Sequence, residues 1–279
     1  MASNQEENPN HAAIDRQRLA FLCQLGVPLR HFFDIGASNG VWSVQVSADF
    51  PDATFDLFEP LVDHVPAYRE KLEPRLASHP GFRLHKFALG PECQKTQFYL
   101  YPTPVSSTAL PLQYVPPDAK CLEVDMLTID YVVQEFRLPV PQLIKVDTQG
   151  CELSILEGAR RTLPQVEVLL LECWLTRGYG KTTPLLGEVA EWLRDFNFYL
   201  WDLGNAWRDP SGTLIAQDCL FLNARSKISQ LGAELRPATS VTAPVSQRRA
   251  GNILIRGLRR FIPRRSLDHG QTSTATKLG

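Results

Sequence analysis

Apolar and polar residues follow two different patterns along this chain, one typical of β-strands and the other of α-helices. Short apolar runs predict β-strands, and the stretches between them repeat apolar residues at helical spacing. The predicted strands are His31–Ile35, Thr54–Phe58, Phe82–Ala88, Thr96–Tyr101, Cys121–Asp125, Gln142–Val146, Val166–Glu172, Phe198–Leu203 and Cys219–Asn223. The predicted helices are Ile14–Leu25, Asn39–Phe50, Leu61–Ala77, Ile129–Phe136, Cys151–Leu163 and Pro184–Phe196.

The order of these elements predicts an α/β fold. Strands that alternate with helices form βαβ units around a mainly parallel sheet. Because such crossovers are right-handed, helices are expected on both faces of the sheet. No helix separates the last two predicted strands, so one of them must run antiparallel to its neighbour. The sequence therefore predicts a Rossmann-like domain with an antiparallel strand near its end.

Composition narrows the class of protein. The chain has 279 residues, of which 44% are apolar, enough to bury one sizeable core. The net charge of −1 and the pI near 6.6 argue against a nucleic-acid-binding protein, which is expected to be basic. The six cysteines form no CxxC pair and no metal-ligand spacing. No apolar run reaches the roughly 20 residues of a membrane span, and we expect a cytoplasmic protein.

The two ends differ from the middle of the chain. Residues 1–12 are expected to be a disordered arm, residues 13–225 the folded domain, and residues 226–279 a loosely ordered tail. Residues 224–279 carry eleven basic and two acidic side chains, a net charge of +9. Residues 252–265 fit a basic amphipathic helix, which suits a membrane surface or a protein partner. Docking on the chain's own domain, or a frayed terminus, is the alternative.

The loop from Asp34 to Gly40 follows the first predicted strand. Gly36 and Gly40 let the backbone turn sharply and let a ligand approach closely, and ligands of open α/β sheets bind at this end of the strands. The spacing is GxxxG, not the GxGxxG of dinucleotide-binding proteins. The loop also matches the GxSxG elbow of hydrolases, but the only later histidine after a suitable acid is His269, in the tail. Glycines that serve packing alone are the remaining alternative.

Glu59 ends the second predicted strand, about 19 residues after Gly40. A carboxylate at this place can accept hydrogen bonds from both hydroxyls of a ribose. A surface glutamate before a proline is the plain alternative. Together with Asp34 and the loop, Glu59 favours a nucleoside ligand.

A second cluster of candidate residues lies between Lys145 and Glu152. Lys145 and Asp147 share one side of a strand, and Asp147 stands at its carboxyl end. Glu152 opens the following helix, where the helix dipole favours a carboxylate. Two carboxylates and a lysine beside a nucleoside site suit a general base, although Asp147 could instead cap that helix. Glu172 and Trp174, at the end of the next strand, are further candidates for the cleft.

These segments carry a resemblance to a known family. The chain resembles the FkbM family of S-adenosylmethionine-dependent methyltransferases over about residues 31–223. The matching segments are Phe33–Gly40, Phe58–Pro60, Ala88–Gly90, Ser106–Ser107, Ile144–Glu152, Leu156–Ala159 and Leu171–Glu172. The family usually has Glu where Gln149 stands, and often Asn-x-Gly where Ser38-Asn39-Gly40 stands.

The resemblance implies a seven-stranded class I methyltransferase sheet and O-methylation of a hydroxyl on a sugar, glycolipid or secondary metabolite. It implies that Asp34, Gly36 and Gly40, with Ser38 and Asn39, line the methionine part of S-adenosylmethionine. Glu59 would hold the ribose, and Phe87 and Ala88 would lie near the adenine. Ser106, Ser107, Glu172 and Trp174 are the expected contacts to the substrate.

Deprotonation of the acceptor is the remaining chemical question, because an alcohol is a poor nucleophile. We expect Asp147 or Glu152, with Lys145 beside them, to take the proton, or Asp147 and Glu172 to hold a divalent cation. Aromatic residues in the loops after residues 102 and 174, namely Tyr114, Trp174 and Tyr179, suit a sugar ring or an apolar body. A non-catalytic S-adenosylmethionine-binding protein and a nicotinamide-dependent dehydrogenase are the alternatives to an enzyme of this class.

Overall fold

The computed structural model describes residues 12–110 and 117–225. The chain divides into a unit of residues 1–237 and a unit of residues 238–279, and all described residues belong to the first. The predictions for residues 1–11, for Tyr114 and for the basic tail with its helix at 252–265 lie outside the described residues. Ala12, the last residue of the predicted arm, is buried, and its N–H donates to the Gln45 side chain at 2.8 Å.

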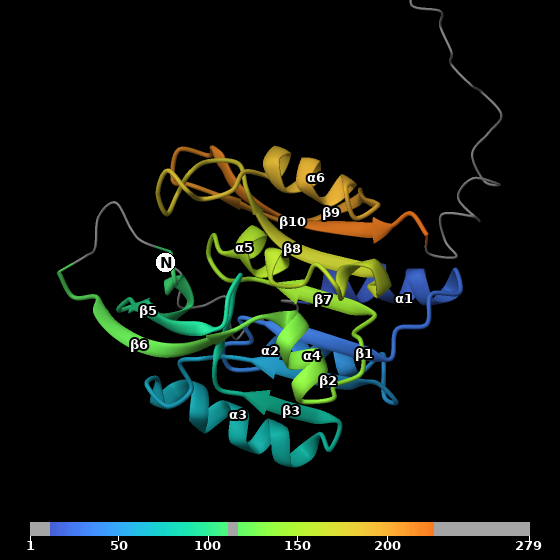
Figure 1. Cartoon of the computed structure of the whole chain (residues 1–279), viewed down its shortest axis with the longest axis horizontal. Coiled ribbons are helices and arrows are strands. Elements are labelled where there is room, and N and C mark those ends of the chain that lie inside the picture. Colours follow the sequence, from blue (N-terminus) through green and yellow to red (C-terminus); the bar gives the residue numbers. More distant parts are fainter. Residues whose placement is uncertain (1–11, 111–116, 226–279) are drawn as a thin grey trace, which may run out of the picture. The chain divides into compact units, whose positions relative to one another are not determined.

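A seven-stranded sheet forms the centre of the domain (Figure 1). Its strands, in spatial order, are β3 (Phe82–His85), β2 (Thr54–Phe58), β1 (His31–Ile35), β7 (Leu143–Val146), β8 (Val168–Trp174), β10 (Leu214–Asn223) and β9 (Phe198–Arg208). Strands β3, β2, β1, β7 and β8 pair in parallel, whereas β10 runs antiparallel to both β8 and β9. The expected Rossmann-like seven-stranded sheet, with an antiparallel last strand, is confirmed.

Helices cover both faces of this sheet (Figure 1). The helices are α1 (Ala13–Gln24), α2 (Val41–Ser47), α3 (Pro66–Ser78), α4 (Ile129–Glu135), α5 (Glu152–Glu157) and α6 (Leu186–Arg194). Buried residues of α1, α2 and α3 pack in one core cluster, and those of α4, α5 and α6 pack in another. The two clusters lie on opposite faces, as right-handed crossovers require. Among the described residues, no helix is long and apolar enough to cross a membrane.

The predicted strand Phe82–Ala88 is wrong as a single element. Its first part is β3, and its last residue begins β4 (Ala88–Leu89), which pairs with β6 (Lys120–Leu127) in a separate three-stranded sheet completed by β5 (Gln94–Leu100). The chain changes sheets because pairing with β2 ends where the N–H of Glu59 donates to the carbonyl of His85 at 3.0 Å. Figure 1 shows β5 and β6 beside the large sheet.

Several predicted helices are too long. The helix predicted from residue 61 begins at Pro66, whose fixed φ suits the first helical position. The helix predicted over Asn39–Phe50 spans only α2, since Gly40 at φ +77° is its N-cap. The helix predicted to residue 163 ends at Glu157, with Gly158 as its C-cap. Gly158 packs closely against backbone, since a Cβ there would lie 2.1 Å from the carbonyl oxygen of Gly90.

Candidate active site

A cavity of about 400 Å³ opens at the carboxyl ends of β1, β2, β7 and β8. In open α/β sheets this edge is the place where ligands bind. Most of the predicted site residues border the cavity. They are Gly36, Ser38, Glu59, Phe87, Ala88, Ser106, Ser107, Lys145, Asp147, Glu172 and Trp174. The two segments that the sequence singled out, after β1 and after β7, therefore lie at one site.

Gly36 joins these two segments. Its φ is +78°, in the left-handed region that favours glycine. A Cβ on Gly36 would lie 2.0 Å from the backbone carbonyl oxygen of Asp147, closer than atoms can approach. The loop after β1 can pack against the tip of β7 only because residue 36 has no side chain.

Glu59 fixes the same loop from the other side. The N–H of Ser38 donates to Oε2 of Glu59 at 2.9 Å, and the N–H of Leu61 donates to Oε1 at 2.9 Å. Glu59 is only 5% exposed, yet it borders the cavity. Glu59 thus ties the loop after β1 to the end of β2 at the edge of the cavity.

Three of the expected cofactor residues do not border the cavity: Asp34, Asn39 and Gly40. Asp34 is fully buried, accepts from the hydroxyl of Ser43 at 2.7 Å and faces the ammonium of Lys145 at 3.4 Å. The side-chain oxygen of Asn39 accepts from Arg75 at 2.6 Å and from the N–H of Val41 at 3.0 Å. Asp34 and Asn39 therefore hold the loop after β1 and the start of α2 in place, rather than facing the cavity.

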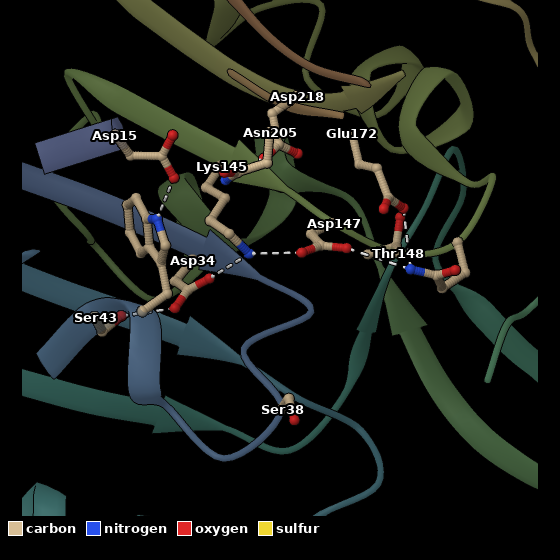
Figure 2. A network of polar contacts seen from close by, with 12 residues as sticks. Asp15, Asp34, Ser38, Ser43, Lys145, Asp147, Thr148, Glu172, Asn205 and Asp218 are labelled. Atoms are coloured by element: carbon tan, nitrogen blue, oxygen red, sulfur yellow. Dashed lines mark hydrogen bonds and ion pairs between the residues drawn. The ribbon is translucent and has the colours of Figure 1, made fainter. Parts of the chain in front are cut away.

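Lys145 links two carboxylates at the centre of the site (Figure 2). Its ammonium lies 3.4 Å from Oδ1 of Asp34 and 3.3 Å from Oδ2 of Asp147, and it sits 5.5 Å from the centre of the Trp42 ring. Burial alone would lower the pKa of Lys145, but the charges of Asp147 and Asp34 outweigh it and raise the pKa above its usual value. Lys145 is therefore a cation at neutral pH, and it cannot serve as a base.

Gln149 connects the remaining polar groups at the tips of β7 and β8. Its amide N–H donates to Glu172 at 3.0 Å and to Asp147 at 3.4 Å, and its carbonyl accepts from the hydroxyl of Tyr179 at 2.6 Å. Burial and then the charge of Asp147 raise the pKa of Glu172 well above its usual value. An uncharged Gln at position 149 therefore bridges two carboxylates where a Glu would add a third.

Glu152 does not border the cavity. It is 1% exposed, and its Oε1 accepts from the N–H groups of Thr148 at 3.2 Å and Gly150 at 3.0 Å. Burial raises the pKa of Glu152 to about 7, although these backbone N–H groups act in the opposite direction. Glu152 thus holds the loop that carries Asp147 and Gln149. Asp147 does not cap α5, whose N-cap is Cys151 without a side-chain cap.

An aromatic and apolar wall closes the cavity, and much of it escaped sequence reasoning. The residues that were missed include Trp42, Tyr68, Phe98, Trp207, Ile215 and Ala216. Trp174 and Tyr179, which were expected, meet edge to face with ring centres 5.1 Å apart. The buried indole N–H groups of Trp174 and Trp207 have no hydrogen-bond partner among the described residues.

A comparison of sequences decides the family. Residues 34–200, more than half of the chain, match the Methyltransferase FkbM domain. The chain belongs to the FkbM methyltransferase family. The matched range contains every predicted site residue, and it excludes α1, most of β9 and the whole of β10. No curated protein sequence matches this FkbM methyltransferase significantly.

Several methyltransferases are among the solved structures that this chain matches. The methyltransferase FkbM from Methylobacillus flagellatus KT is 18% identical, with a TM-score of 0.46 over 70% of this chain and 43% of its own length. The chain thus spans less than half of that protein. The precorrin-6y C5,15-methyltransferase from Geobacter metallireducens GS-15 is 14% identical, with a TM-score of 0.39 over 74% and 86% of the two chains. An O-methyltransferase family protein from Burkholderia thailandensis is 12% identical, with a TM-score of 0.35 over 76% and 57%.

The expected divalent cation finds little support in this FkbM methyltransferase. Among residues 12–110 and 117–225, no group of three or more His, Cys, Asp or Glu side chains is arranged to hold a metal ion. The two carboxylates named for such a cation, Asp147 and Glu172, are instead bridged by Gln149.

Proposed function

We propose that this protein is an S-adenosylmethionine-dependent O-methyltransferase whose acceptor is a hydroxyl of a sugar, a glycolipid or a secondary metabolite. One observation carries the proposal. A single cavity is bordered by Glu59 at the end of β2 and, across the loop of Gly36, by Asp147 at the end of β7. The first carboxylate suits a nucleoside, and the second suits deprotonation of an acceptor.

The residues of the cavity fit S-adenosylmethionine in size and in chemistry. Its volume of about 400 Å³ lies in the range of ligand pockets, which run from roughly 300 to 1,000 Å³. Glu59 ends β2 beside the cavity, where a carboxylate suits the ribose hydroxyls, and Phe87 and Ala88 offer an apolar surface for the adenine. When bound, S-adenosylmethionine supplies a methyl group activated by a positively charged sulfur, and the carboxylates of the cavity complement that charge.

Asp147 is the strongest candidate for the base. Its side chain is 34% exposed and borders the cavity, whereas Glu152 is committed to backbone N–H groups away from it. Glu172 also borders the cavity, but its raised pKa favours the protonated form, which cannot accept a proton. Asp147 also lies 3.3 Å from the ammonium of Lys145, and a carboxylate in this position suits a general base.

The aromatic wall supports the class of acceptor. Trp174, Tyr179 and Trp207 offer flat surfaces that suit a sugar ring or an apolar body. The two indole N–H groups without partners among the described residues can donate to oxygens of a hydroxylated ligand. Holding the acceptor oxygen in line with the methyl group can contribute roughly 7–11 kcal/mol to such a two-substrate step.

The test combines binding with turnover. Calorimetric titration of the full chain with S-adenosylmethionine and with NAD identifies the ligand, and a labelled-methyl screen of glycan and metabolite extracts identifies the acceptor. We expect Asp147→Asn to abolish methyl transfer while S-adenosylmethionine binding survives. Glu191→Gln, on the exposed face of α6, is the matched control and should behave as wild type. Unchanged turnover in Asp147→Asn would remove Asp147 from its role, and binding of NAD alone would refute the proposed function.

A further inference from the structure

A second, smaller cavity adjoins the candidate active site on the α1 side. It measures about 20 Å³, enough for one water molecule, which needs roughly 10–15 Å³. Lys145, Asp147 and Glu172 border both this small cavity and the large one. The small cavity adds Asp15, Asn205 and Asp218, all outside the range that matches the family.

The backbone around Asp218 is built to direct its side chain. Strands β9 and β10 change register between the pairs Gln217–Ala206 and Cys219–Leu203, so Asp218 alone faces both Gly204 and Asn205. Such a β-bulge re-aims a side chain and leaves backbone groups unpaired. The amide of Gln217 satisfies them by donating to the carbonyls of Gly204 at 2.7 Å and Asn205 at 3.1 Å.

Glycine at position 204 makes room for this arrangement. A Cβ there would lie 2.6 Å from the Cβ of Asp218. Asn205 then donates its amide N–H to Oδ2 of Asp218 at 3.0 Å. Figure 2 shows Asp218 and Asn205 on the side of Lys145 that lies away from Ser38.

Charged groups face Asp218 from three neighbouring elements. Asp15 comes from α1, Lys145 and Asp147 from β7 and its tip, and Glu172 is the direct partner of Asp218 in the pairing of β8 with β10. Two carboxylates opposite each other are unfavourable when both are ionised, and one lysine cannot balance four acids. Burial and then the charge of Asp15 raise the pKa of Asp218 to about 7. The group can therefore exchange a proton near neutral pH.

We propose that Asp218 receives the proton which Asp147 takes from the acceptor hydroxyl, through one water molecule in the small cavity. This inference rests on the proposed function. The acceptor's oxygen forms a bond to the methyl group while the S–C bond of S-adenosylmethionine breaks, and its electron pair stays on the sulfur of S-adenosylhomocysteine. The acceptor's O–H bond breaks in the same step, and the proton passes to Asp147. Asp147 passes it to the water, the water passes one of its own protons to Asp218, and Asp218, which is only partly buried, returns it to solvent. No electron is transferred, and Asp147 is ionised again for the next turnover.

The first test needs no acceptor. Carbon-13 NMR of the full chain, labelled only at aspartate carboxyl groups, follows each aspartate with pH. We expect a wild-type signal that titrates near pH 7, is absent in Asp218→Asn and is kept in Glu191→Gln. If no aspartate titrates in that range, or if the signal survives in Asp218→Asn, the proposal is overturned whatever the enzyme's activity.

The second test separates relay from structure. With the acceptor from the labelled-methyl screen, Asp218→Asn should bind S-adenosylmethionine as wild type does but lower kcat at pH 7 about tenfold or more, and change the pH profile of kcat. Asp218→Glu should recover part of the rate. A kcat and a pH profile within twofold of wild type in Asp218→Asn would overturn the relay. A wild-type protein that does not bind S-adenosylmethionine would instead count against the proposed function.

Discussion

Replacing Lys145 with Met tests the charge balance beneath the active site. The ammonium of Lys145 lies 3.4 Å from Asp34, which is fully buried, and 3.3 Å from Asp147. Methionine keeps much of the length and apolar stem of the lysine but removes the only cation that the structure shows between these carboxylates. Asp34 then keeps its burial and the hydrogen bond from the hydroxyl of Ser43, but it loses the ammonium that faces it.

The expected magnitude follows from this geometry. Two unit charges about 4 Å apart interact by about 4 kcal/mol at an effective dielectric constant of 20. Removing one partner of a buried ion pair typically costs about 3–5 kcal/mol. We therefore expect Lys145→Met to lose about 3–5 kcal/mol of unfolding free energy at pH 7. Because the pKa of Lys145 is raised on folding, this stabilisation is fully present at any pH below the pKa of a free lysine. It is lost only as the pH rises through the higher pKa of the folded protein.

Equilibrium unfolding in urea at several pH values is the assay. Lys95→Met is the matched control, since Lys95 pairs with Asp125 on the surface, where both side chains are about 60% exposed, and no measurable change is expected. If Lys145→Met loses less than about 1 kcal/mol of unfolding free energy at pH 7, the ammonium does not stabilise the fold as a buried ion pair.

Three further predictions concern the same framework. Gly36→Ala should lower the unfolding free energy by at least 1–2 kcal/mol, the approximate cost of a left-handed backbone. It should also abolish S-adenosylmethionine binding, because the new Cβ would meet the carbonyl of Asp147. Urea unfolding and calorimetry check these two effects, and normal binding would contradict the second. Burial would raise the pKa of Asp56, but hydrogen bonds from two histidines and Arg83 outweigh it and hold the pKa below its usual range. Its stabilisation is therefore present above about pH 4 and lost as the pH falls through the folded value; Asp56→Asn should flatten the acid side of a plot of Tm against pH, and an unchanged slope would count against this. Glu152 has its pKa raised to about 7, so ionising it costs stability as the pH rises from about 4.5 to 7; Glu152→Gln should remove roughly 3 kcal/mol of this pH dependence, and an equal pH dependence in both proteins would exclude it.

The sequence predicted the parts of the site that local chemistry determines. Gly36 stands where the backbone needs a positive φ, and Glu59 stands where a parallel strand ends, so each residue indicated its own place. Because parallel strands share one carboxyl edge, the segments after β1, β2, β7 and β8 could be expected at one cavity. The same rule does not say whether a side chain points into that cavity, and Glu152 and Asp34 point elsewhere.

Contacts between distant elements were beyond sequence reasoning. Asp15 reaches the site because its carboxylate accepts from the indole N–H of Trp42 at 3.0 Å, and nothing in the pattern of α1 indicates that contact. Trp207 lies on β9 and Asp218 on β10, where the β-bulge shifts the pairing of the two strands and so changes which side chains point toward the site. The break between β3 and β4 was missed for a similar reason, since a second sheet competes for Ala88.

The direct test of the nucleoside site is calorimetric titration of the full chain with S-adenosylmethionine, in wild type and in Glu59→Gln. We expect the wild type to bind S-adenosylmethionine and not NAD. Glu59→Gln should weaken binding at least tenfold, while Glu191→Gln should bind as the wild type does. A wild type that fails to bind S-adenosylmethionine would show that the cavity is not its site, and a Glu59→Gln variant that binds it equally well would show that Glu59 does not hold it.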